Sequence, residues 1–308
     1  MPVGGSTEES DFDTSYMPGV NGEYLNGGNS ESRADDVLSK MTWGNLGVSS
    51  GDLMLATQPK SRSMTASSTI IYELACYANF PRPWADEAAE IQAIQNGNWL
   101  PASEDFDAIS KTTTAASTGT KPYAQIMSTF EDIIVTVTYF APKAKGFGRT
   151  MPSRVKRLNL FFYAGAQNLE FNGTLTTNGS WVSTFGPTLD LNSSVVDINV
   201  LTNILGNSAN SGVLSTLRTA WGSSAEIWLY TSGGVPNDAL AQLFAKVMGA
   251  KVRAFTEPFW VLPRYDAAQN TITARDEFGI GADFTAAAAT RTKNLHTLDA
   301  LATRRFNP

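Results

Sequence analysis

The chain has 308 residues, 42% of them hydrophobic, and a formal net charge of −6 at pH 7. This size allows one large domain, and the acidic balance predicts neither nucleic-acid binding nor attraction to an anionic membrane surface. We expect no membrane span, because no apolar run is long enough, and no signal peptide, because the first residues are acidic and polar.

The cysteine and histidine content limits the chemistry. A single Cys excludes an internal disulfide, and one Cys with one His excludes a zinc site of the usual ligand types. We therefore expect no metal and no cofactor. From the lack of disulfides we infer that the protein is synthesised in a reducing cytoplasm, and export by a dedicated system is compatible with this.

The N-terminal third is predicted to be an arm followed by two helices and a loop. Residues 1–40 are rich in Gly, Ser, Asn, Asp and Glu, which predicts a disordered or extended arm that could hold a neighbouring protein. The rest, 41–308, is predicted to be a single α/β domain. Apolar spacing predicts a helix over 67–80 and another from Asp86 to Gly97. Residues 101–122 read as a loop, in which the acidic cluster 103–107 is predicted to be solvated.

The next segment, 123–140, is ambiguous. Ile126, Phe130, Ile133 and Ile134 have helical spacing, whereas the β-branched stretch IIVTVTYF favours a strand. We interpret it as a helix that runs into a strand.

The core of the domain is predicted to be a βαβ unit over about 154–255. A buried strand ends at Ala164 and Gly165, and a capping box from Ser194 to Asp197 predicts a helix after it. A second apolar strand ends near Thr231. Asn237 is then a good N-cap for an apolar helical stripe that ends at a glycine C-cap, Gly249, before a third strand. The apolar strands 155–163 and 226–231 are predicted to be parallel neighbours.

The C-terminal part, about 256–306, is predicted to form a hairpin around 264–270 and a closing helix that ends in Arg304 and Arg305.

Four places could carry chemistry. Cys76 lies in an apolar stretch and is predicted to be core, not a nucleophile, and His296 lies in a polar stretch and is predicted to be solvated. Ser232 follows a buried strand and precedes a helix, as a nucleophile elbow does, but Tyr230 stands where that motif needs glycine. The same loop, with backbone amides from Ser232, Gly233, Gly234 and Asn237, could instead bind a small anion at a helix start.

Two segments together resemble a known family. LNLFFYAGAQNLEFNG, 158–173, resembles the part of caspase-like cysteine peptidases in which a strand ends in His-Gly. AEIWLYTSGG, 225–234, with the helix and strand after it, resembles their strand that ends in the catalytic Cys. The resemblance covers about 154–255 and implies a three-layer α/β sandwich with a mainly parallel sheet.

The chain departs from that family at both catalytic positions. Ala164 stands before Gly165 where the family has His, and Thr231 or Ser232 stands where it has Cys. The resemblance therefore implies a relative that has lost the catalytic pair and keeps the scaffold as a structural or interaction protein, as a component, cargo or effector of a bacterial assembly. Its partner would be another protein or a second copy, held through residues 1–40. A hydrolase that uses Ser232, or an anion-binding module at 232–238, are the alternatives.

Overall fold

The computed structural model describes residues 71–112, 123–138, 154–175, 181–183 and 188–308. The predicted N-terminal arm, 1–40, lies outside the described residues. Among the described residues, no helix is both long enough and apolar enough to cross a bilayer.

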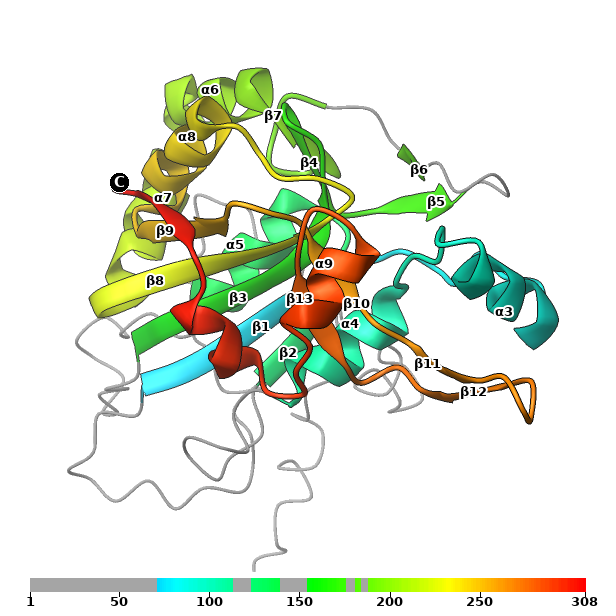
Figure 1. Cartoon of the computed structure of the whole chain (residues 1–308). Helices are drawn as coiled ribbons and strands as arrows, with labels where there is room; N and C mark the ends of the chain where they lie inside the picture. Colours follow the sequence, from blue (N-terminus) through cyan, green and yellow to red (C-terminus); the bar gives the residue numbers. More distant parts are fainter. Residues whose placement is uncertain (1–70, 113–122, 139–153, 176–180, 184–187) are drawn as a thin grey trace, which may run out of the picture.

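A mainly parallel sheet forms the centre of the fold, as the sequence predicted (Figure 1). Its strand order is β14-β9-β8-β3-β1-β2, and the five strands of that path from β9 to β2 are mutually parallel. They span β1 Ile71–Ala78, β2 Tyr123–Met127, β3 Arg154–Ala164, β8 Trp221–Ser232 and β9 Lys251–Phe255. The outer strand β14, Thr303–Phe306, is antiparallel to β9. Strands β4 Asn168–Glu170 and β7 Val195–Asp197 extend the sheet antiparallel to the end of β3.

The two strands of the predicted βαβ unit are direct neighbours. Leu158 pairs with Ile227 and Phe161 with Tyr230, in parallel register. This confirms the prediction for 155–163 and 226–231. The reason is visible in their burial: from Leu158 to Tyr163 and from Ile227 to Thr231 both strands are buried on both faces, as in the centre of a parallel sheet.

Helices cover one face of the sheet (Figure 1). They contact one another and the strands. They are α5 Phe130–Thr138, α6 Ile198–Gly206, α7 Ser211–Ala220 and α8 Asp238–Met248, with the short turn η4 Ser208–Asn210 between α6 and α7. Helix α8 begins and ends as predicted: Asn237 accepts from Leu240 N, and Gly249 has a left-handed φ of 67°. Helix α6 is capped by Asp197, which accepts from Val200 N, and not by Ser194.

The other face carries mixed elements. Helix α4, Ser103–Ser110, packs on β1, β2 and β3, and the ring of Phe106 lies 6.1 Å from that of Phe161. The chain after β9 forms two small ribbons, the first of β10 Phe259–Val261 with β13 Phe278–Ile280 and the second of β11 Arg264–Asp266 with β12 Thr271–Ala274. Then follow α9 Phe284–Ala289 and η5 Leu295–Ala300. The remaining elements are α3 Glu87–Gln95 and the pair β5 Gly173–Leu175 and β6 Trp181–Ser183.

Several predicted elements are wrong in type. Residues 71–78 form strand β1, not a helix, because a strand buried on both faces shows no alternation and cannot be told from a buried helix by spacing. The segment 123–140 has its order reversed, with strand β2 before helix α5. The β-branched helix is supported by Thr136 and Thr138, whose hydroxyls donate to Asp132 O and Ile134 O one turn earlier.

Two further differences concern a predicted loop and the predicted closing helix. The predicted loop 101–122 contains helix α4. The predicted closing helix is divided into α9 and η5, and Arg304 and Arg305 lie in β14. The unpaired edge of β9 explains the second difference, because a strand there satisfies backbone groups that a helix would leave open. The hairpin predicted around 264–270 is present as β11 and β12.

Candidate functional site

The fold brings the predicted site positions together at the carboxyl ends of β3 and β8. Tyr163 is the register partner of Ser232. A Cβ atom on Gly234 would lie 2.7 Å from the carbonyl oxygen of Ala164, and Asn237 N donates to Ala166 O at 2.8 Å. The two strand ends and the loop between β8 and α8 are therefore in direct contact.

Strand alternation places the predicted pair on opposite faces of the sheet. Ser232 is in register with Tyr163, so both point to the face that carries α4 and β10. Ala164 and Thr231 belong to the other parity and point toward the helical face. Of the two residues predicted at the nucleophile position, only Thr231 shares a face with Ala164.

Ser232 is enclosed by its surroundings. The residue is 2% exposed, and its hydroxyl donates to the carbonyl oxygen of Phe259 at 3.0 Å. Thr231 is also buried, at 3% exposure. A nucleophilic hydroxyl needs a base and access to substrate. The Ser232 hydroxyl donates to a backbone carbonyl and is not accessible to a substrate, so the geometry does not support Ser232 as a nucleophile.

The two polar side chains at the start of α8, Asn237 and Asp238, are engaged within the protein. Asn237 Oδ1 caps α8, and the Asp238 carboxylate receives Nη1 of Arg304 at 2.5 Å. Nη2 of Arg304 donates to Pro236 O at 2.7 Å. A carboxylate already stands in the first turn of α8, and it opposes the binding of a second anion there.

The single thiol has no route to reactivity. Cys76 lies in the middle of β1 and is fully buried. Burial raises the pKa of the Cys76 thiol far above its usual value, and the nearby Asp132 carboxylate raises it further. Because the thiolate is the nucleophile, Cys76 is a small core residue, as predicted, although in a strand.

His296 is not solvated, which corrects the sequence prediction. Its Nδ1 lies 3.1 Å from Asp299 Oδ2 and its Nε2 lies 3.1 Å from Glu73 Oε2. These hydrogen bonds, to Asp299 and then to Glu73, raise the pKa of His296 to about 9. At neutral pH the ring is an imidazolium that donates from both nitrogens, so it cannot accept a proton from a nucleophile.

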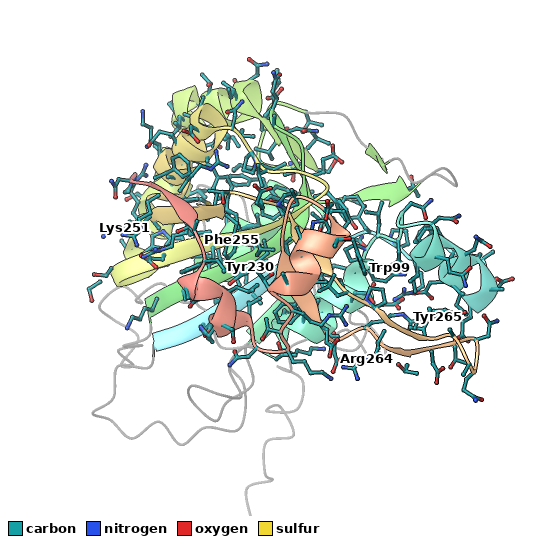
Figure 2. All side chains as sticks on the ribbon, viewed as in Figure 1. Trp99, Tyr230, Lys251, Phe255, Arg264 and Tyr265 are labelled. Carbon is teal, nitrogen blue, oxygen red and sulfur yellow. The ribbon has the colours of Figure 1, made fainter. Side chains whose placement is uncertain are left out.

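His296 belongs to a network centred on Arg157, which the sequence analysis missed. Arg157 Nη1 and Nη2 lie 2.5 Å and 2.8 Å from the carboxylate oxygens of Asp299. Nη2 also donates to the hydroxyl of Tyr230 at 2.7 Å, and the guanidinium lies 4.3 Å from the ring centre of Trp228. Figure 2 labels Tyr230 in the central part of the sheet. The network joins η5 to three adjacent strands.

One signal could have revealed this network. Arg157 and Asn159 flank Leu158 at the point where β3 becomes buried, and Asn159 donates to Glu73 Oε1 at 2.7 Å. Polar residues inside a buried strand require partners. The sequence therefore indicated that a polar cluster existed, but not which distant residues, among them His296, complete it.

A second ionic cluster corrects the prediction for 103–107. Asp105 is 2% exposed, accepts from Ala102 N at 2.7 Å and receives Arg82 at 3.0 Å. Glu90 receives both Arg82 and Arg275 at 2.8 Å. These contacts hold α3 and α4 to the segment after β12. Within the described residues, no group of three or more potential metal ligands comes together.

The two ends of the central strands are therefore different in character. Arg157 and Tyr163, the register partner of Ser232, are six positions apart along β3, so their Cα atoms are separated by roughly 20 Å. Only the Tyr230 hydroxyl extends the His296 network toward Ser232. The protein's only imidazole and its predicted hydroxyl nucleophile cannot act together. Comparison with family models, with curated proteins and with solved structures finds no match.

Proposed function

We propose that this protein is a non-catalytic structural or interaction protein built on a caspase-like scaffold that has lost its catalytic pair. One observation carries the proposal, namely the residues at the two adjacent strand ends where the pair would stand. Ala164 and the buried Thr231 lie on one face of the sheet, and on the other face the buried Ser232 donates its hydroxyl proton to Phe259 O. Neither position supplies a thiolate or an imidazole.

The supply of reactive groups elsewhere supports the same reading. Cys76 is buried with a raised pKa, and His296 is held between two carboxylates at the opposite end of the sheet. What remains is a rigid α/β scaffold whose binding partner would be another protein or a second copy, as in the bacterial assembly that the resemblance implies.

A serine-directed fluorophosphonate probe and a broad peptide library test the absence of catalysis. We expect no labelling and no cleavage in the wild type, with Ser232→Ala as the matched control. Labelling that disappears in Ser232→Ala would overturn the proposal in favour of a serine hydrolase.

The anion-binding alternative has a separate readout. A ligand that binds only the native state raises the melting temperature. We expect phosphate to leave the melting temperature unchanged at constant ionic strength. A rise that Asn237→Ala abolishes would assign the 232–238 loop to anion binding.

A further inference from the structure

A turn over residues 188–193 closes on the first turn of helix α5, just after the carboxyl end of β2. Phe130 N donates to Ser193 O at 3.0 Å, and Glu131 N donates to Leu191 O at 2.8 Å. These two N–H groups belong to the start of α5 and have no partner inside the helix, so the turn satisfies them. We call residues 188–193 the clasp.

The clasp is held in a strained shape. Leu189 has a left-handed φ of 61°, a conformation that is unfavourable for a residue with a Cβ atom. Thr188 Oγ1 and Asn192 N donate to Asp190 Oδ1 at 2.7 Å and 2.8 Å. Asn203 of helix α6 donates to Leu189 O. A strained turn that a few hydrogen bonds keep closed can open locally while the sheet stays folded.

Three carboxyl groups act on one another where the clasp contacts α5, those of Glu131, Asp132 and Asp190. Two of them are hydrogen-bonded: Asp190 accepts within the clasp, and Asp132 accepts from Ser128 N and Thr129 N at 2.7 Å and 2.9 Å. The half-buried Glu131 carboxyl group has no hydrogen bond or ion pair within the described part of the chain. It is therefore the member of the three for which a charge is least compensated.

The neighbouring elements supply no cation to Glu131 among the described residues. Strand β2 and helix α6 have no charged residue, and those of β4 and β7, Glu170 and Asp197, are also acidic. Helix α7 has one charged residue, Arg218, whose side chain lies against the turn after α8. Helix α8 contacts α5 through Phe244, and its basic residue Lys246 is exposed, about 200° around the helix from Phe244.

The surroundings of Glu131 favour its neutral form. Burial, and after it the like charges of Asp132 and Asp190, raise the pKa of Glu131 from 4.5 to about 7. The positive amino end of α5 favours an ionised carboxyl group, but that effect is screened by solvent and is smaller than the cost of burying an uncompensated charge. The ionisation of Glu131 therefore falls near neutral pH.

We propose that the clasp is a proton-controlled contact, which protonation of Glu131 closes on α5 and ionisation of Glu131 loosens. Opening releases the N–H groups of Phe130 and Glu131 and exposes the buried side chain of Leu191 at the carboxyl end of the sheet. The stabilisation of the closed clasp is full below about pH 4.5 and is lost as pH rises through about 7, because the closed state binds the proton more tightly. This inference does not depend on the absence of catalysis, and its readout is separate from that of the probe experiment.

Native-state hydrogen exchange of the full chain, followed by NMR, tests the clasp. The amides of Phe130 and Glu131 report on it, since both donate to the turn. After correction for intrinsic exchange rates, we expect the protection of these two amides to fall at least about tenfold from about pH 5.5 to about pH 8.

A matched pair of variants assigns the effect to one carboxyl group. Glu131→Gln keeps the neutral form at every pH, so the protection of the Phe130 amide should change by less than about threefold over the same range. Glu257→Gln removes the same charge at an exposed position after β9 and should retain the wild-type change.

Three results would overturn the proposal. The first is a protection of the Phe130 amide that does not change with pH in the wild type. The second is an equal loss of protection in Glu131→Gln, which would assign the pH dependence to another group. The third is a ¹³C titration of the Glu131 carboxyl group with a pKa at or below 4.5, which would show that the fold does not oppose its ionisation.

Discussion

At the residue scale, Arg157 is the side chain on which most polar contacts of the sheet face depend. Its guanidinium is 14% exposed and serves Asp299, Tyr230 and Asn159 at once, while stacking on Trp228. Removing one partner of a buried charge cluster leaves the others desolvated and unpaired. The network therefore affects the free energy of unfolding mainly through the cost of leaving its other charged groups without a partner, and less through the attraction of the ion pair itself.

We expect Arg157→Met to lower the free energy of unfolding by about 3 kcal/mol, because it keeps the side-chain volume, removes the donor to the Tyr230 hydroxyl and leaves His296 as the charged partner of both Asp299 and Glu73. Arg253→Met is the matched control, since Arg253 also lies over Trp228 but pairs, among the described residues, with the single carboxylate of Glu226. Its cost should be about 1 kcal/mol or less. Urea denaturation measures both, and equal costs would contradict the assignment.

His296 makes this same network sensitive to pH. Its charged neighbours are Glu73 of β1, Arg157 of β3 and Asp299 of η5. Because the folded pKa, about 9, is raised above the unfolded value of 6.5, the imidazolium stabilises the fold fully below pH 6.5. This stabilisation is lost as pH rises through about 9.

We therefore expect the His296 Cε1 proton, which is unique in the chain, to titrate with a pKa near 9 in an NMR experiment. The unfolding free energy should fall more steeply between pH 7 and about 9.5 in the wild type than in His296→Gln. A measured pKa at or below 6.5 would show that the two carboxylates do not hold the ring.

At the scale of elements, the turn between β8 and α8 accepts only small residues, because its backbone lies very close to the end of β3. Gly233 has a φ of 81°, and Gly234 lies so close to Ala164 O that a Cβ atom would come to 2.7 Å from it. That atom is backbone in a buried strand, so it cannot move aside at low cost. The glycines let β8 leave the sheet beside β3 and enter α8.

We expect Gly234→Ala to destabilise the fold by roughly 1–3 kcal/mol, which lowers the melting temperature by about 2–4 °C per kcal/mol for a domain of this size. Gly206→Ala at the end of α6 is the control, because its Cβ would meet no atom within 4 Å. That variant should be neutral or slightly stabilising. Equal melting temperatures for both variants would refute the close approach.

At the scale of the molecule, the two ends of the central strands carry different polar groups. The carboxyl ends of β3 and β8, where open parallel sheets usually bind ligands, are enclosed by Phe259 and by Arg304 on Pro236 O. The amino-terminal halves of β1 and β3 carry the Glu73 and Arg157 side chains of the His296 network.

The sequence by itself determined the βαβ unit. The apolar runs of β3 and β8, the cap Asn237 and the C-cap Gly249 are local signals, and local backbone preferences are read directly from residue types. The absence of a thiol or imidazole at Ala164 and Ser232 was equally readable, since it requires only identity and strand ends.

Only the tertiary structure decided the type of β1, the burial of Asp105 and the partners of His296. A strand buried on both faces and a buried helix have the same apolar content, so Cys76 was placed in the wrong element. Glu73 and His296 are 223 positions apart, and no local pattern records that they meet. Charges in one chain become a network or a surface only when strand order sets which residues are neighbours, and strand order is a property of the whole sheet.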